Sequence, residues 1–156
     1  MSNKLRVGAL CVGLCLGAGC TTVRDARAPL EYFPAEPGAA YSNAARVGDV
    51  LYLAGQIGIR PDGSVPDGIQ EQTRLALESM SATLQSLGSS MDNVFKCTVM
   101  LDDISNWADF NKVYVTFFKP GRLPARNAFG VEGLALKGLE VELVCLAYSP
   151  PSSTAR

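Results

Sequence analysis

The order of apolar repeats along this chain of 156 residues is compatible with few folds. Five segments alternate apolar and polar residues as β-strands do, and two segments repeat apolar residues with the period of an α-helix. The expected strands cover residues 41–47, 50–56, 94–101, 125–131 and 139–148. The helices fall before and after the third strand. The order ββαβαββ predicts an α+β domain in which two helices cover one face of a mixed sheet.

Local residue types support both helices. The first helix is expected to begin after Asp67-Gly68 and to end at Gly88, since glycine is a common helix terminator. The second is expected over residues 105–118 and carries a row of aromatic side chains. The apolar stripe of the first helix is Ile69, Ala76, Met80, Leu84 and Leu87, and the row of the second is Trp107, Phe110, Tyr114 and Phe117.

The last two strand-like segments are otherwise apolar but each holds charge: Arg126 in the first, and Glu140 with Glu142 in the second. A charge in such a place costs free energy unless it is paired, solvated in a cleft or used for binding. If Phe129 and Val131 face the helices, alternation turns Arg126 and Ala128 away from them. The same alternation places Glu140 on that helix-free face. These two charged residues are therefore the first candidates for function.

The helix-free face also carries apolar residues that one domain cannot cover. They are Tyr52, Met100, Val144 and Leu146. A contiguous apolar surface of this kind is typical of an interaction site. The pattern therefore predicts self-association, with the two charged residues at or near an interface between subunits.

Composition excludes several classes of chemistry. An apolar fraction of 47% and a charged fraction of 19% indicate one globular domain with its own core. The chain has no histidine. Ser-His-Asp and Cys-His catalysis and most zinc sites are thereby excluded. General acid–base catalysis would have to use carboxylate, lysine, tyrosine or cysteine side chains.

Residues 1–19 are expected to be a signal peptide. Lys4 and Arg6 precede an apolar run, 7–18, that is too short to span a bilayer and suits a signal-peptide core. Small residues then lead to Cys20, as at a bacterial lipoprotein processing site. The interpretation is an exported protein, anchored by lipid on Cys20 in the periplasm or outer membrane of a Gram-negative bacterium. Ordinary secretory cleavage and a weak membrane anchor are the alternatives.

The remaining ends are expected to lie outside the fold. Residues 20–38 are polar and rich in proline and are predicted to be a flexible tether, and residues 150–156 a tail. Loss of residues 1–19 removes two cations and no anion, which takes the formal net charge from −1 to −3. An acidic domain argues against a nucleic-acid partner.

Two cysteines remain in the predicted strands, Cys97 and Cys145. They are either two buried thiols or, in an oxidising compartment, a disulfide. Sequence alone does not choose between these alternatives, because a disulfide needs close approach of the two residues. A catalytic thiol is disfavoured since no histidine is present to activate it.

Residues 39–149 resemble the RidA/YjgF family of enamine/imine deaminases. The resemblance lies in an ordered set of short motifs, of which the arginine motif together with the Glu-Val-Glu segment is the most specific. The motifs are Tyr41-Ser42-Asn43-Ala44, Leu53-Ala54-Gly55-Gln56-Ile57, Asn111-Lys112-Val113-Tyr114, Pro124-Ala125-Arg126 and Glu140-Val141-Glu142.

The resemblance implies a chorismate-mutase-like domain, a homotrimer and active sites between subunits. It implies that Arg126 grips a substrate carboxylate and that Glu140 positions or activates water. Tyr41, Gly55 and Asn111 match other positions in the cleft. No metal and no cofactor are implied.

The sequence departs from the family pattern near the proposed site. Ala128 stands where many members have cysteine, and Ala54 stands where serine is common. The segment before Glu140 is about one residue short, so Glu142 is an alternative for handling water.

The leading functional hypothesis is hydrolytic deamination of 2-enamino or 2-imino acids to 2-keto acids and ammonia. One alternative is a non-catalytic trimer in the cell envelope that binds a carboxylate metabolite or acts as a holdase. Another is a related hydrolase of a carboxylated amide or carbamoyl compound. The proposed export leaves the source of imines open.

Overall fold

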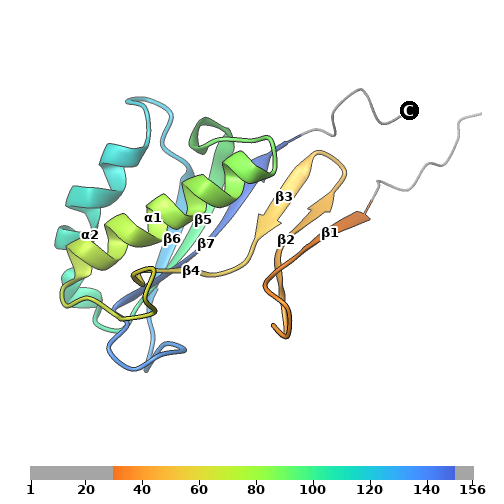
Figure 1. Cartoon of the computed structure of the whole chain (residues 1–156). Coiled ribbons are helices and arrows are strands. Elements are labelled where there is room, and N and C mark those ends of the chain that lie inside the picture. Colours follow the sequence, from red (N-terminus) through yellow and green to blue (C-terminus); the bar gives the residue numbers. More distant parts are fainter. Residues whose placement is uncertain (1–29, 150–156) are drawn as a thin grey trace, which may run out of the picture.

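The computed structural model describes residues 30–149, which form one sheet with two helices on the same side (Figure 1). Short 3-10 turns precede β5 and flank α2. The elements are β1 (Leu30–Pro34), β2 (Ser42–Val47), β3 (Val50–Leu53), β4 (Gln56–Ile57), α1 (Ile69–Ser86), β5 (Val94–Leu101), α2 (Trp107–Tyr114), β6 (Ala125–Gly130) and β7 (Val141–Tyr148). No helix in this part of the chain is both long and apolar enough to cross a membrane.

The strand order in the sheet is β1-β2-β3-β7-β5-β6, and β4 pairs with β7. The β5–β6 pair is parallel. The other pairs are antiparallel. The connection from β5 to β6 contains α2, as a parallel crossover requires. The predicted α+β architecture with a mixed sheet is confirmed.

The core lies between the helices and the sheet. The predicted stripe of α1 is confirmed, since Ala76, Met80 and Leu84 are fully buried. From α2, Phe110 and Tyr114 are buried; Phe110 stacks on Trp107 and packs at a tilt against Tyr114. Each large side chain of this kind stabilises the fold by about 1.5–3 kcal/mol relative to exposure.

The two faces of β7 confirm the predicted alternation. Val141, Leu143, Cys145 and Ala147 are fully buried beneath the helices, whereas Glu142, Val144 and Leu146 on the other row are partly exposed. Tyr52 pairs with Leu146 and is 47% exposed. We call the side of the sheet that carries Tyr52, Glu142, Val144 and Leu146 the open face.

Strand β1 was not expected, because residues 20–38 were assigned to a tether. Leu30–Pro34 instead pairs with β2 and forms an edge of the sheet. Arg46 secures this strand. Its Nη1 donates to Glu31 at 2.8 Å, and its guanidinium lies 5.1 Å from the Phe33 ring centroid. A single short strand between prolines has too few alternating residues to be recognised without its partner.

The expected strand 50–56 is broken in the structure. Tyr52 pairs with Leu146, but Gln56 pairs with Leu143, so the β3–β4 side holds one residue more than β7. Ala54-Gly55 forms this break, although the Ala54 amide still donates to Asn43 at 2.9 Å. A local insertion of this kind bends a strand and re-aims its side chains.

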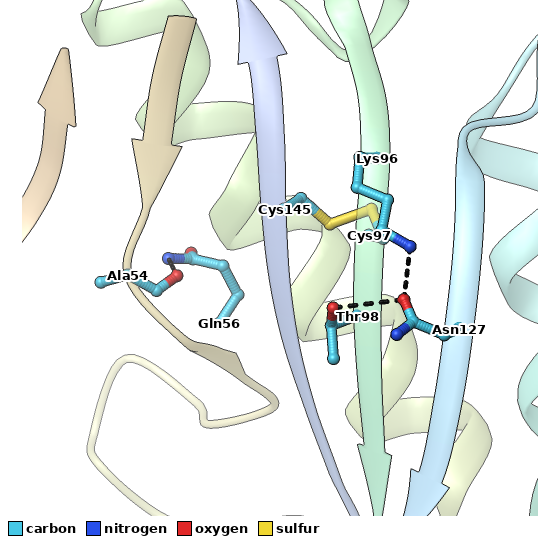
Figure 2. The surroundings of a disulfide bond; sticks show 7 residues. All are labelled: Ala54, Gln56, Lys96, Cys97, Thr98, Asn127 and Cys145. Carbon is cyan, nitrogen blue, oxygen red and sulfur yellow. Dashed lines mark hydrogen bonds between the residues drawn. A yellow bond between two sulfur atoms is a disulfide. The ribbon is translucent and has the colours of Figure 1, made fainter. Parts of the chain in front are cut away.

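Cys97 and Cys145 form a disulfide, which resolves the alternative left open by the sequence (Figure 2). They are direct register partners on β5 and β7, and both are fully buried. Figure 2 also shows the neighbouring residues Lys96 and Thr98 extending toward Asn127 of β6.

Candidate functional site

Arg126 lies on the helix side of β6, over the aromatic row of α2. In the parallel β5–β6 pair its register partner is Cys97, which is buried beneath the helices. Side chains of paired residues share a face of the sheet. The guanidinium carbon is 4.3 Å from the Trp107 ring centroid, 4.4 Å from that of Tyr114 and 5.6 Å from that of Phe110.

Two polar groups here are buried without a partner. Within residues 30–149, Arg126 Nη1 and the Tyr114 hydroxyl make no hydrogen bond. Burial raises the pKa of the Tyr114 hydroxyl, and the charge of Arg126 offsets only part of that rise. Burial lowers the pKa of Arg126, although a guanidinium stays charged at any physiological pH. The result is a partly desolvated cation beside a neutral phenol.

Both groups line a groove of about 510 Å³ at the edge of the sheet, which we call the arginine groove. Its wall is mostly apolar and comes from α2, the residues that flank it, and β6. The lining residues are Ile104, Trp107, Tyr114, Val115, Leu123, Pro124, Arg126, Asn127 and Ala128. A mostly apolar cavity with a few polar groups is the usual form of a small-molecule site.

The expectation that Arg126 and Glu140 share the helix-free face is wrong. It assumed that Phe129 faces the helices, but Phe129 is 51% exposed and pairs with Met100 on the open face. The large rings of α2 occupy the space above β6. The small side chain of Ala128 and the flat guanidinium fit beneath those rings, which leaves Phe129 on the other side.

Glu140 lies just before β7, at the start of α1. Its Oε1 accepts a hydrogen bond of 2.9 Å from the Gly68 amide, and its own amide donates to Gln72 Oε1 at 2.8 Å. A carboxylate at a helix N-terminus is favourable because the first amides of a helix lack partners within it. Glu140 therefore has one oxygen engaged in the fold.

Glu142 lies in a second cavity, of about 490 Å³. It pairs with Ile57 on one side and Met100 on the other, so its side chain is on the open face. We call this cavity the Gly55 pocket. Its lining residues are Tyr41, Ser42, Ala54, Gly55, Ile57, Ala135 and Glu142.

The structure thus divides the predicted site residues between two cavities that share no lining residue. Arg126 and Ala128 line the arginine groove, whereas Tyr41 and Gly55 line the Gly55 pocket. Glu140 lines neither of these cavities. Asn111 is half-buried on α2 and likewise lines neither. Cys20 lies outside the described residues.

Sequence reasoning missed part of the groove wall. The sequence predicts Trp107 and Tyr114 as members of an aromatic helix row, and no motif marks Ile104 or Leu123 as lining a groove. A usable indication was present in the aromatic spacing along α2, because rings at positions i, i+3 and i+7 form a continuous row that suits a flat cation.

Solved structures of YjgF-type proteins have this fold. A YjgF-family protein from Neisseria meningitidis is 25% identical, with a TM-score of 0.70 that covers 79% of this chain and 97% of that chain. RidA from the Antarctic bacterium Psychrobacter is 32% identical, with a TM-score of 0.67 over 78% of this chain and 98% of that chain.

The family model described as endoribonuclease L-PSP matches residues 34–149, and the chain belongs to this RidA/YjgF family. A rat protein named 2-iminobutanoate/2-iminopropanoate deaminase is 40% identical over 118 residues, which are 74% of this chain and 85% of that protein. A RutC family protein from Pyrococcus abyssi is 39% identical over 110 residues, 69% of this chain and 85% of that protein.

Gly55 of the pocket and two other glycines, Gly58 and Gly133, provide a matched test of close packing against the backbone. A Cβ on Gly58 would lie 2.3 Å from the Gln72 carbonyl oxygen, whereas one on Gly55 would lie 1.9 Å from the flexible Glu142 carboxylate. Gly58→Ala should lower the free energy of unfolding by about 1–3 kcal/mol in urea titration, because backbone cannot move aside. Gly55→Ala should lower the free energy of unfolding by less, since the Glu142 side chain can rotate away.

Gly133, with nothing within 4 Å of its Cβ position, is the control. Equal losses of unfolding free energy in Gly58→Ala and Gly133→Ala would contradict the close packing of Gly58 against the Gln72 backbone.

Proposed function

We propose that this protein deaminates 2-imino acids, or their 2-enamine tautomers, to 2-keto acids and ammonia by hydrolysis. The observation that carries the proposal is the half-buried Arg126 guanidinium, whose buried Nη1 has no partner among the described residues and which lies between aromatic rings in a groove. A cation of this kind favours a carboxylate as its ligand. The deaminase names of the rat, mouse and human relatives agree with this substrate class.

The chemistry requires few groups. Arg126 would hold the substrate carboxylate and fix the imine carbon against a water molecule. Water oxygen bonds to C2 while a proton passes to the imine nitrogen. The hydroxyl proton of the resulting carbinolamine then passes to the amino nitrogen, the C–N bond breaks, and ammonia leaves as the C2 carbonyl forms. A carboxylate can orient the water and relay its proton.

We propose Glu140 as the water-handling carboxylate. Its hydrogen bond from Gly68 fixes one oxygen in place, which orients the other. The resemblance in sequence assigns the same role to this residue. Glu142 is the competitor, because it lies with Tyr41 and Gly55 in the second cavity.

We further propose that the site is completed between subunits of a homotrimer. The arginine groove and the Gly55 pocket are separate on one chain, although the resemblance places residues of both in one cleft. Exposed Phe129 and Tyr52 on the open face supply apolar surface for such an assembly. If the arginine groove of one subunit faces the Gly55 pocket of the next, the residues that line the two cavities would form one site.

A nuclease activity, which the family description mentions, is a weaker proposal for this chain. The net charge is −1, and no histidine is present to act as acid or base. Affinity for RNA depends on cations that neutralise phosphates.

The first test is the rate of ammonia release from 2-iminopropionate generated in situ. Arg126→Ala should lower kcat/KM by about a hundredfold or more, because a charge-assisted grip is lost. Glu140→Gln should lower kcat by about a hundredfold while Gln still accepts from Gly68. Glu142→Gln, the matched control, should change kcat by less than about threefold. If Glu142→Gln lowers kcat more than Glu140→Gln does, the water-handling role belongs to Glu142. A wild-type rate equal to that of buffer would eliminate the deaminase and favour a binding module.

A second test concerns the assembly. Arg126→Ala and Gly55→Val should each be inactive, since the second fills the Gly55 pocket. If sites combine the two halves from neighbouring subunits, unfolding and refolding the variants together at equal amounts should restore about a quarter of the sites, as random mixing in a cyclic trimer requires. Each variant refolded alone is the control. An inactive mixture in which mass spectrometry detects mixed trimers would refute the shared site.

We also propose export and a lipid anchor on Cys20. The Cys97–Cys145 disulfide supports this proposal, because disulfides persist mainly in oxidising compartments. Cells fed labelled palmitate should label the wild type and fail to label Cys20→Ser. Equal labelling of both would exclude Cys20 as the lipidation site.

A further inference from the structure

The arginine groove contains a second hydrogen-bond donor that the proposed mechanism does not use. Tyr114 is 2% exposed, and within the described chain its hydroxyl has no hydrogen-bond partner. The ring centroid of this tyrosine lies 4.4 Å from the guanidinium carbon of Arg126, whose Nη1 is also unpartnered. Two unsatisfied donors therefore lie next to each other in one cavity.

Packing alone does not account for this hydroxyl. The Tyr114 ring packs at a tilt against Phe110 and Phe118, with centroid distances of 5.3 Å and 4.8 Å. A phenylalanine would make the same contacts without burying a polar atom. An unsatisfied buried hydroxyl destabilises a protein, so its presence here calls for a partner that binds in the groove.

The chemistry of the two donors specifies that partner. Arg126 offers only N–H groups and a positive charge. A tyrosine hydroxyl is protonated at neutral pH, and burial raises the pKa of Tyr114 further, so it offers an O–H group. An anion with several acceptor positions satisfies both groups together, and a carboxylate has about four such positions.

We propose that the Tyr114 hydroxyl is a second substrate-binding group, which donates to the carboxylate that Arg126 holds. The inference rests on the proposed function for the identity of the substrate and adds a residue to its binding site. Tyr114 acts in binding and takes no part in proton transfer. The ring also stacks on the guanidinium and thereby keeps the two donors adjacent.

The test uses Tyr114→Phe, which removes one oxygen and preserves the ring. The probe is 2-oxobutanoate in titration calorimetry, with 2-butanone as the ligand that lacks a carboxylate. Tyr114→Phe should bind 2-oxobutanoate about tenfold more weakly than wild type, since a hydrogen bond to a charged group is lost. In turnover of 2-iminopropionate, KM should rise by a similar factor and kcat should stay nearly constant.

Stability separates this role from a structural one. Without ligand, Tyr114→Phe should raise Tm by about 2–4 °C, because a buried unsatisfied hydroxyl is gone. Tyr32→Phe is the control, since Tyr32 lies on β1 with 64% of its surface exposed, and it should change neither affinity nor Tm.

Unchanged affinity of Tyr114→Phe for 2-oxobutanoate overturns the inference. A lower Tm that accompanies weaker binding also overturns it. The proposed function fails separately, by absence of wild-type turnover. Weaker carboxylate binding by Tyr114→Phe, with Tm raised, would still establish the role of the hydroxyl in that event.

Discussion

The parallel pairing of β6 with β5 determines the chemistry of this protein. Because Arg126 is aligned with Cys97, it faces the helices, where it meets the rings of α2. A shift of one residue would turn it to the open face and put Asn127 beneath the helices. The groove, the unpartnered donors and the separation from Glu142 all depend on this register.

A guanidinium tolerates such a place better than an ammonium would. It is planar and weakly hydrated, so aromatic faces replace part of its lost solvation. They do not replace hydrogen bonds, and among the residues described Nη1, which carries two N–H bonds, has no partner. A buried N–H group without a partner lowers the stability of the protein. The same reasoning applies to the Tyr114 hydroxyl beside it.

The sequence predicts most of the helices and strands, but it predicts less well how they pair and which face of the sheet the helices cover. Strand β5 and helix α1 agree closely with the expected ranges, because each has a long and regular apolar period. Strand β1 was missed since its five residues gain their structure from pairing with β2. The side taken by Arg126 was predicted wrongly, because alternation fixes which residues share a face but not which face is covered. That depends on the bulk of the α2 rings, which compete with Phe129 for the same volume.

The disulfide in the core has a consequence for how the chain folds. Its two cysteines are 48 residues apart, and the closed loop contains α2 and the whole of β6. In the oxidised chain, β5 and β7 remain joined at their register point even when the rest is unfolded. The chain then does not need to search for the contact between Cys97 and Cys145. The entropic cost of closing the loop between them is already present in the unfolded state. The strand that carries Arg126 would therefore dock onto a pair whose alignment is set in advance by a covalent bond.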